Sequence, residues 1–515
     1  MKIIKSTLTQ SLFLTVQLSP MKRYEQYAQE ITDLIKAQTL RPGDRLPSVR
    51  QASAHRKISP STVFEAYYLL EARGLVQARP RSGYYVNALT QPTQAEPHTA
   101  LPSQQSTPVV ISDLVFEVLG STRNLDVVPL GSAFPSPTLF PLDKLARSLT
   151  PAMRKLAPSR MVEDLTLGND RLRRQIGLRY VVEGAAVEVD EIVITHGAME
   201  ALNLCLQVVT QPGDVVAVES PTFYSALQAL ERLNLRAVEV ATHPRDGVDL
   251  DSLAEVLQRH PVKACWFMPN FQNPLGSLMP DHRKQALVEL LATHEVPLIE
   301  DDVYGELYFG LRRPLPAKVY DRHGLVMHCS SFSKCLAPGY RVGWVAAGRF
   351  AQQVQRLKLM TTLATAIPSQ LAISDYLQRG GYERHLRQLR QILATQQALA
   401  LRLIAQHFPK STRVTRPEGG YFLWLELPPQ VDTLQLHRLA LSQRISLAPG
   451  HMFSADQRFS HCLRLNYGHP GDDRFEEALK TVGLLACRLC EETGLGDARH
   501  PHLPPQYMSV PHTTT

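Results

Sequence analysis

The stretch Ser330-Ser331-Phe332-Ser333-Lys334, followed by Gly339-Tyr340-Arg341-Val342-Gly343, decides how the larger part of this chain folds. It comes directly after residues 325–329, an apolar run typical of a buried strand. A lysine beside hydroxyls and an arginine offers an amine for a Schiff base and donors for a phosphate. The stretch therefore points to a binding site for a phosphorylated aldehyde at the end of a strand.

Further apolar runs at residues 192–195, 215–219, 264–268 and 296–300 alternate with helical stretches. Strands separated by helices predict a largely parallel sheet that is covered on both faces. An open α/β sheet binds its ligand outside the carboxyl ends of its strands. We therefore look for the rest of the site just after each apolar run.

Two motifs after these runs suit a pyridine ring. Asp301, in Glu300-Asp301-Asp302-Val303-Tyr304, is the carboxylate expected to stay ionised beside the ring nitrogen, and Tyr304 is expected to donate to the ring's phenolic oxygen. Asn273, in Asn273-Pro274-Leu275-Gly276, is expected to share that oxygen. Asn-Pro-x-Gly is also an ordinary turn sequence, so it is the joint arrangement that favours Lys334 and Asp301.

The remaining candidates would hold the phosphate, the ring face and a carboxylate. A strand turns into a helix at Gly197, so the amides of Ala198 and Met199 are expected to point at the phosphate. Phe223 is expected to stack on the ring, with a core position as the alternative, and Tyr224 is a weaker candidate. Arg464 is expected to clamp a carboxylate through a bidentate fork, with a salt bridge as the alternative. The hydroxyl and guanidinium donors near Lys334 are Ser331, Ser333 and Arg341.

Taken in this order, across residues from about 115 to 490, the motifs resemble the fold type I aminotransferases of the aspartate aminotransferase superfamily. The resemblance implies a body with large and small subdomains, a head-to-tail homodimer, and pyridoxal 5′-phosphate bound as an internal aldimine on Lys334. One position departs from the pattern. Such enzymes usually have a tyrosine before the glycine that here is Gly168, whereas this chain has Asp164-Leu165-Thr166-Leu167. This departure indicates that the phosphate is bound differently from the usual pattern.

The N-terminal part of the chain has a different pattern. Apolar residues at helical spacing predict a helix from about residue 24 to 35, a second starts at Pro47-Ser48, and Ser59-Pro60 caps a third that stops at Gly74. Two β-favouring runs, 75–78 and 84–86, follow. Between Met21 and Val86 there are eleven Lys and Arg residues against six Asp and Glu residues. Three helices and a basic hairpin predict a winged helix-turn-helix.

The first turn of the third helix is the part that enters the major groove in such a domain. The N-terminal segment from Tyr24 through Pro42-Gly43-Asp44 to Gly83-Tyr84-Tyr85-Val86 resembles the GntR family of bacterial regulators. It departs from the family in residues 52–57, where the usual leucine of the second helix is missing. The alternative for any single arginine is that it belongs to a solvated charged surface and does not contact DNA. The residues expected to contact double-stranded DNA are Arg50, Ser59, Ser61, Thr62, Arg79 and Arg81.

Composition sets outer limits. The 515 residues exceed one ordinary core, and the 44% hydrophobic and 20% charged content is typical of globular domains. The seven cysteines form no disulfide framework, and the Cys487–Cys490 pair lacks further metal ligands, so we expect a cytoplasmic protein without a metal. The apolar run 12–18 is too short to cross a membrane. No membrane association is expected.

The sequence predicts five regions: an N-terminal extension at 1–20, a winged helix-turn-helix at 21–88, a linker at 89–110, an aminotransferase-like body at 111–492 and a disordered tail at 493–515. A GntR-like reader joined to such a body resembles the MocR-type regulators. The resemblance implies control of transcription by the cofactor, or by an amino compound bound through an aldimine. The alternatives are an active aminotransferase with an appended DNA-binding domain and a cofactor-free dimerisation scaffold.

Overall fold

The computed structural model describes residues 23–37, 39–41, 43–72, 75–79, 82–86, 94–120, 126–154, 156–158, 167–185, 187–310 and 312–496. Contacts divide the chain into two compact units, Met1–Gln91 and Pro92–Thr515. Each unit is described by itself. The narrower domain limits expected from composition stay predictions.

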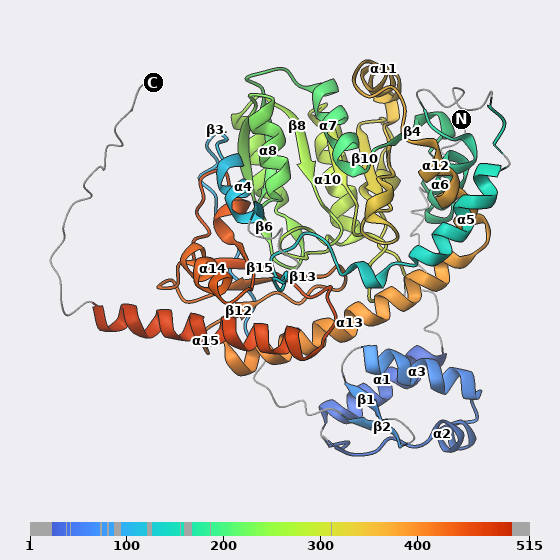
Figure 1. The fold of residues 1–515 in the computed structure, drawn as a ribbon, viewed down its shortest axis with the longest axis vertical. Helices are drawn as coiled ribbons and strands as arrows, with labels where there is room; N and C mark the ends of the chain where they lie inside the picture. The colour runs from blue at the N-terminus through green and yellow to red at the C-terminus, as the bar shows by residue number, and fades with distance from the viewer. Residues whose placement is uncertain are drawn as a thin grey trace, which may run out of the picture. The chain divides into compact units, whose positions relative to one another are not determined.

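The N-terminal unit is the predicted winged helix-turn-helix (Figure 1). Ser48 caps α2 by accepting the N–H of Gln51, whose side chain in turn accepts the Ser48 N–H, and this capping box starts the helix after Pro47. β1 and β2 pair antiparallel, and Arg45 forms a bridge to β2. The elements of the unit are α1 (Arg23–Lys36), α2 (Val49–Arg56), α3 (Pro60–Ala72), β1 (Val76–Arg79) and β2 (Gly83–Val86).

A small core holds these helices together. Tyr27, Ala28, Ile31 and Ile35 line one face of α1 and are buried against α3 and the hairpin, whereas Leu34, expected on that face, is 37% exposed. The buried residue of α2 is Ala52, within the segment where the expected leucine is missing. A small side chain therefore occupies the buried position of this short helix.

The body is built on a nine-stranded sheet in the order β3-β6-β5-β8-β9-β10-β11-β4, with β7 paired to β6. The pairs from β6 through β10 are parallel, and β11 is antiparallel to both its neighbours. The strands are β3 (Thr107–Pro108), β4 (Ile192–Thr195), β5 (Val215–Ser220), β6 (Arg236–His243), β7 (Gly247–Val248), β8 (Val262–Phe267), β9 (Leu298–Asp301), β10 (Val326–Ser331) and β11 (Gly343–Ala346).

The central strands are apolar throughout because both faces of the sheet are covered. On β5, Val216 and Val218 belong to one core, and Val215 and Ala217 belong to the other. Successive side chains of a strand point to opposite faces, so a continuous apolar run is what a two-sided burial requires. Helices that surround the sheet in Figure 1 include α5 (Leu142–Arg154), α6 (Asp170–Glu183), α7 (Ala198–Val209), α8 (Tyr224–Arg232), α9 (Leu250–Arg259), α10 (Asp281–Thr293), α11 (Ala351–Thr361) and α12 (Ile367–Gln378).

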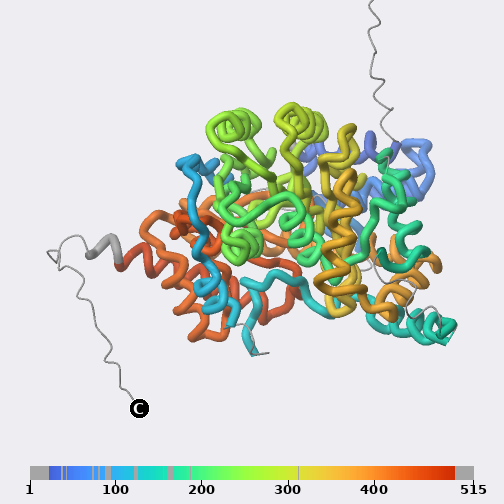
Figure 2. The backbone as a smooth tube through the Cα atoms, turned by 90° about the horizontal axis from the view of Figure 1, so that it is seen from above, coloured from blue at the N-terminus to red at the C-terminus, as the bar shows by residue number. Residues whose placement is uncertain are grey.

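A second, antiparallel sheet in the order β12-β13-β15-β14 forms the small subdomain. The C-terminal part of the chain, orange to red, gathers at one end of the body in two perpendicular views (Figures 1 and 2). The fold is therefore the fold type I architecture expected from the sequence. Its elements are α13 (Gly381–His407), β12 (Arg413–Val414), β13 (Phe422–Glu426), α14 (Thr433–Ser442), β14 (Ala448–Pro449), β15 (Cys462–Asn466) and α15 (Asp473–Gly496).

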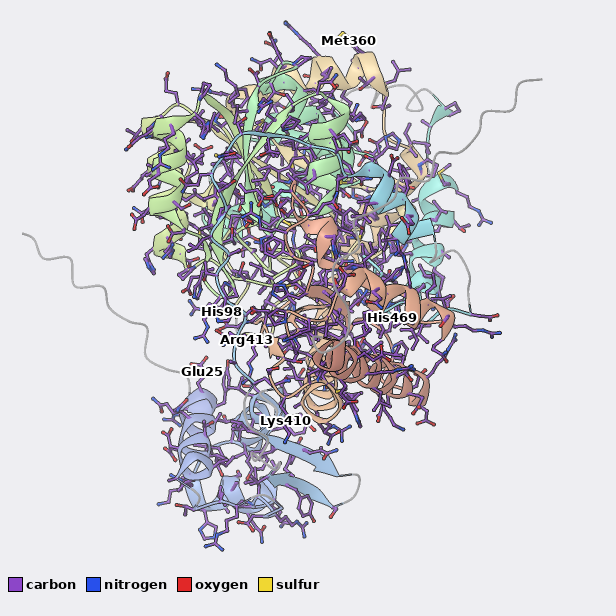
Figure 3. All side chains as sticks on the ribbon, turned by 90° about the vertical axis from the view of Figure 1, so that its left-hand side faces the viewer. Glu25, His98, Met360, Lys410, Arg413 and His469 are labelled. Carbon is purple, nitrogen blue, oxygen red and sulfur yellow. The ribbon has the colours of Figure 1, made fainter. Side chains whose placement is uncertain are left out.

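Residues 94–110, which belong to the linker predicted at 89–110, lie along the body. The backbone N–H of Val414 donates to the Ala95 carbonyl (3.0 Å), and His98 bonds Glu426 (2.7 Å) in the small subdomain, near the labelled side chains of Figure 3. Further on, β3 pairs with the outermost parallel strand, β6. Polar residues order here because edge strands offer them backbone partners. At the other end, α15 continues to Gly496, into the segment expected to be a tail.

Two expected absences concern only the part of the chain that the structure describes. None of its helices is long and apolar enough to cross a lipid bilayer. Within the same residues, no group of His, Cys, Asp or Glu side chains is arranged to hold a metal ion. The N-terminal extension at 1–20 lies outside the described residues.

Candidate functional site

A cavity of about 160 Å³ lies where β9 and β10 end and α7 begins. Its walls contain nine of the residues that the sequence picked out, drawn from segments more than a hundred residues apart: Ala198, Met199, Phe223, Asp301, Tyr304, Ser331, Ser333, Lys334 and Arg341. The fold thus brings most of the candidates together at the carboxyl ends of the strands.

Lys334 follows the last strand residue of β10 by three positions, and its side chain enters this cavity. Nζ donates to the Ala133 carbonyl (2.9 Å) and lies 3.6 Å from the centre of the Phe134 ring. Burial, and then the positive charge of Arg464, lower the pKa of Lys334 to about 7, against the opposite effect of Asp301. A large fraction of this amine is therefore neutral, and so nucleophilic, near pH 7.

Asp301 is the last residue of β9 and is 1% exposed. Burial, followed by the negative charge of Asp302, raises the pKa of Asp301 to about 7. Its Oδ1 atom is buried and has no hydrogen-bond partner among the described residues. Because buried polar atoms are normally paired, this oxygen is a free acceptor aimed at the cavity wall. The protonated nitrogen of a pyridine ring fits such an acceptor.

Asn273 lies next to the cavity and connects Tyr304 to Arg464. Its Nδ2 donates to the Tyr304 hydroxyl (3.4 Å), and its Oδ1 accepts from Arg464 (3.0 Å). Arg464 is fully buried on β15, also donates to the Gly131 carbonyl (2.7 Å), and has no partner at Nε among the described residues. Burial raises the pKa of Tyr304 above its usual value, so its hydroxyl stays a donor. The Nε–H of Arg464 is therefore free to bind a ligand.

The side of the cavity where the sequence predicts a phosphate is formed by two close segments. The Arg341 guanidinium donates to the Ser333 hydroxyl (3.4 Å) and to the His196 carbonyl (3.1 Å), next to the first turn of α7. A Cβ on Gly343 would lie 2.5 Å from the Gly197 carbonyl carbon. Only glycines permit this approach, which leaves the Ala198 amide end open beside a cation, as a phosphate requires.

Two aromatic side chains line the cavity beside the predicted ring position. Phe223 is half-buried, and Tyr224 is buried with its ring centre 4.8 Å from that of Phe223. The Arg464 guanidinium lies 5.9 Å from the centre of the Tyr224 ring. The assignment of Phe223 as the stacking partner stays a prediction.

Sequence reasoning missed the segment that covers Lys334. The Ala133 carbonyl accepts from both Lys334 and the Tyr421 hydroxyl (3.1 Å), and Phe134 lies over the lysine amine. Gly131-Ser132-Ala133-Phe134 contains no motif, and it lies some two hundred positions before Lys334. No sequence signal could have placed it here. The departing residues Asp164, Leu165 and Thr166 lie outside the described residues.

At the DNA-binding end, the first turn of α3 carries the expected polar side chains. The Ser59 hydroxyl contacts the Ser61 and Thr62 hydroxyls (both 2.8 Å) and accepts the Thr62 N–H (3.1 Å), so it caps the helix. Arg50 is exposed in the first turn of α2. Arg79 ends β1, but its side chain, like all of Arg81, lies outside what the structure describes.

α3 also exposes an aromatic side chain that the sequence reasoning passed over. Phe64 is 54% exposed one turn after Pro60, although its neighbour Val63 is fully buried. A large apolar side chain on this surface is in unfavourable contact with water unless a partner covers it. The face of α3 that carries Ser61 therefore also exposes an apolar side chain.

Comparison with known proteins agrees with both units. The family "Aminotransferase class I and II" matches residues 167–482, and "Bacterial regulatory proteins, gntR family" matches residues 23–86. The relative described as "Uncharacterized HTH-type transcriptional regulator YdcR" of Escherichia coli is 48% identical over 90% of this chain and 99% of its own length. YjiR of the same organism, described in the same words, is 36% identical over 92% of this chain and 100% of its own.

Among solved structures, the α-aminoadipate aminotransferase LysN of Thermus thermophilus, complexed with N-(5′-phosphopyridoxyl)-L-leucine, is similar with a TM-score of 0.65. It is 28% identical and matches over 75% of this chain and 99% of its own. The chain therefore belongs to the MocR-type transcriptional regulators, which join a GntR-type helix-turn-helix domain to an aminotransferase class I and II domain.

Proposed function

We propose that this regulator binds pyridoxal 5′-phosphate at Lys334 and uses the cofactor, or an amino compound that reacts with it, to change its affinity for DNA. The observation that carries the proposal is the joint presence of Lys334, Asp301 and Arg341 around one cavity, in a chain that also contains a winged helix-turn-helix. A dimerisation scaffold would have no use for a buried lysine, an unpaired carboxylate and a phosphate cradle.

The cofactor, when bound, supplies an aldehyde that condenses reversibly with a primary amine and a ring that withdraws electrons from it. Lys334 would present its Nζ, about half neutral near pH 7, to the aldehyde, and Asp301 would accept the ring N–H. Arg341, Ser333 and the first amides of α7 would hold the phosphate, and Tyr304 with Asn273 would orient the phenolic oxygen. These residue roles are proposals that fit the geometry.

An effector with an amine and a carboxylate fits the rest of the cavity. Its amine would replace Lys334 Nζ, and its carboxylate would take the unused N–H of Arg464. Because Arg464 lies on β15 of the small subdomain, an amino acid held there would draw the small subdomain toward the large one. Residues 94–110 contact both subdomains and are followed back along the chain by the DNA-binding unit. The movement of the small subdomain would be passed to that unit through them.

The N-terminal unit is expected to bind double-stranded DNA through α3. Ser59, Ser61 and Thr62 would touch bases or phosphates, and Arg50, Arg79 and Arg81 would neutralise phosphates and position the domain. The protein is expected to act as a homodimer, so that two such domains meet paired half-sites.

The test is binding of purified protein to its own upstream DNA, with and without pyridoxal 5′-phosphate and candidate amino acids, at a stated salt concentration. The proposal predicts a cofactor-dependent visible band, a borohydride-trapped adduct on Lys334, and a ligand-dependent change in DNA affinity. If ligands left DNA affinity and DNA bending unchanged, the coupling would be refuted even where the adduct forms.

A second candidate is an active aminotransferase that carries a DNA-binding domain. The full set of cavity residues and the similarity to LysN favour it. Steady turnover of an amino-acid and 2-oxoacid pair would support the enzyme, whereas a single half-reaction without turnover would support the regulator.

A further inference from the structure

Glu300 and Asp301 end β9, Asp302 follows directly, and all three carboxylates are essentially buried. Side chains alternate along a strand. Asp301 faces the cofactor cavity, so Glu300 and Asp302 point to the opposite side. Buried carboxylates are costly unless they are paired and hydrogen-bonded. The opposite side of β9 must therefore supply donors.

Asp302 has donors from three separate elements. Asn270 donates to Oδ1 (3.0 Å), while Arg313 (2.5 Å) and Nε2 of His328 (3.1 Å) approach Oδ2. Glu300 accepts the backbone N–H groups of Ala317 (2.6 Å) and Lys318 (3.0 Å). Both flanking carboxylates are thus held in place from behind the strand.

His328 is itself fixed in orientation. It lies on β10, one strand over from Asp302, and its Nδ1 lies 2.6 Å from the Tyr180 hydroxyl. The Trp344 indole N–H donates to the same hydroxyl (3.0 Å), and the Tyr180 and His328 rings meet edge to face. Because Nε2 carries a hydrogen whenever Nδ1 accepts from Tyr180, and also in the charged ring, the ring donates to Asp302 in either state.

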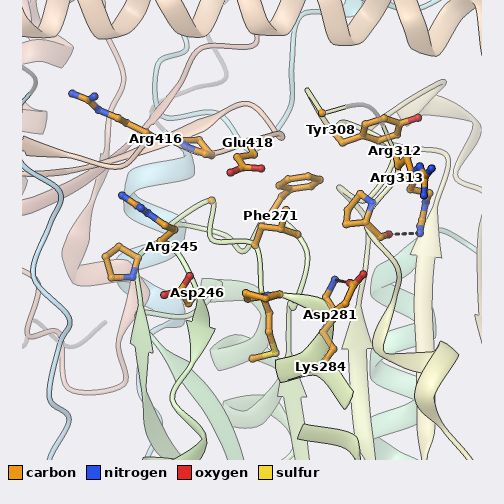
Figure 4. Close-up of a pocket in the computed structure, with 18 of the residues that line it drawn as sticks. Arg245, Asp246, Phe271, Asp281, Lys284, Tyr308, Arg312, Arg313, Arg416 and Glu418 are labelled. Carbon is orange, nitrogen blue, oxygen red and sulfur yellow. Dashed lines mark hydrogen bonds and ion pairs between the residues drawn. The ribbon is translucent and has the colours of Figure 1, made fainter. Parts of the chain in front are cut away.

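The charges around His328 come from several elements. Glu300 and Asp302 lie on β9 and just after it, Arg313 lies in the following loop, and Glu183 ends α6. Burial works against a charged ring, but the hydrogen bond to Asp302 and the charge of Glu300 raise the pKa of His328 overall. Arg313 also lines a separate cleft of about 550 Å³, drawn in Figure 4.

The pKa of Asp301 depends on the charges of Asp302 and His328. After burial, the negative charge of Asp302 is the largest cause that raises the pKa of Asp301, and the charge of His328 acts in the opposite direction. The positive charge of a protonated His328 ring offsets the charge of Asp302 and therefore lets Asp301 ionise more easily. Separately, the Asp302 backbone N–H donates to the Cys329 carbonyl (2.9 Å), which fixes the end of β9 beside β10.

We infer that His328 is a positioning residue for the cofactor: by holding the Asp302 carboxylate behind β9, it keeps Asp301 ionised and aimed at the ring nitrogen. The inference rests on the proposed binding of pyridoxal 5′-phosphate. It assigns His328 no contact with the cofactor, and it predicts that the residue matters only to a ligand that has a nitrogen at that ring position.

The experiment compares two ligands on the full-length protein: pyridoxal 5′-phosphate and its 1-deaza analogue, in which carbon replaces the ring nitrogen. The dissociation constant of the 1-deaza analogue divided by that of pyridoxal 5′-phosphate measures how much Asp301 contributes to binding. In His328→Leu we expect this ratio to fall about tenfold, which corresponds to one unit in the pKa of Asp301. His328→Gln keeps an N–H donor but carries no charge, so it should recover only part of the ratio, and Tyr180→Phe should give a smaller fall.

His437→Leu is the matched control, because His437 is also a buried histidine but lies on α14, where it accepts the Leu447 N–H. It should leave the ratio unchanged. Equal weakening of both ligands in His328→Leu and in Tyr180→Phe would show a merely structural role and overturn the inference. If the wild-type protein bound neither ligand, the proposed cofactor site would fail with it, whereas tight binding with an unchanged ratio would overturn only the role of His328.

Discussion

Lys334 should react with an aldehyde at a pH where ordinary lysines do not. With its pKa lowered from 10.5 to about 7, its neutral fraction rises as pH increases through 7. At pH 7.5 about three quarters of Lys334 would be neutral, compared with about a thousandth of an ordinary lysine. The physical cause is burial beside Arg464, since both disfavour the ammonium form.

The assay is the rate at which cofactor-free protein forms its visible band with pyridoxal 5′-phosphate, measured between about pH 5.5 and 9.5. Free N-acetyl-lysine methyl amide, mixed with the same aldehyde, serves as the control, and its rate should keep rising up to about pH 10. We expect the protein's profile to reach half its plateau near pH 7. A protein profile that follows the control would refute the claim that the cavity keeps this amine neutral.

Three further changes test other parts of the structure. Gly343→Ala should weaken cofactor binding at least about tenfold, because its Cβ would meet the Gly197 backbone, whereas Gly339→Ala, with nothing within 4 Å, should not; equal affinities in equilibrium titrations would contradict the close approach. Ser48→Ala should lower the free energy of unfolding of the N-terminal unit by about 1 kcal/mol, since the cap of α2 is lost, and an unchanged denaturation midpoint would argue against the capping box. Arg50→Ala should reduce the salt dependence of DNA binding by about one phosphate contact without changing sequence preference, and a changed preference would mean that Arg50 reads bases.

Much of the fold could be predicted because its signals are local. The apolar run of β5 and the cap at Ser59 act within a few residues, and the structure has both elements where the sequence predicts them. β11 and the antiparallel sheet of the small subdomain were not predicted. Their strands are short and depend on partners far away in sequence for their hydrogen bonds, and such partners leave no local pattern.

Some residues of the candidate site could likewise be predicted from local motifs, and others could not. Lys334, Asp301 and Asn273 could be chosen from motifs, because each lies at or just after the end of a strand and has a side chain suited to one task. Phe134 and the carbonyl of Ala133 could not, since their neighbours come from elsewhere in the chain. His328 looked like one more residue of an apolar strand.

By itself, the sequence determined the two units of this protein and singled out Lys334 as the candidate reactive amine, because these follow from local periodicity and from side-chain chemistry. Only the tertiary structure decided the charge states, since the ionisation of Lys334 and Asp301 depends on burial and on neighbours contributed by other elements. It also decided that residues 94–110 lie along both subdomains. Electrostatic energies depend on distance in space, and the order of residues along a chain does not contain that distance.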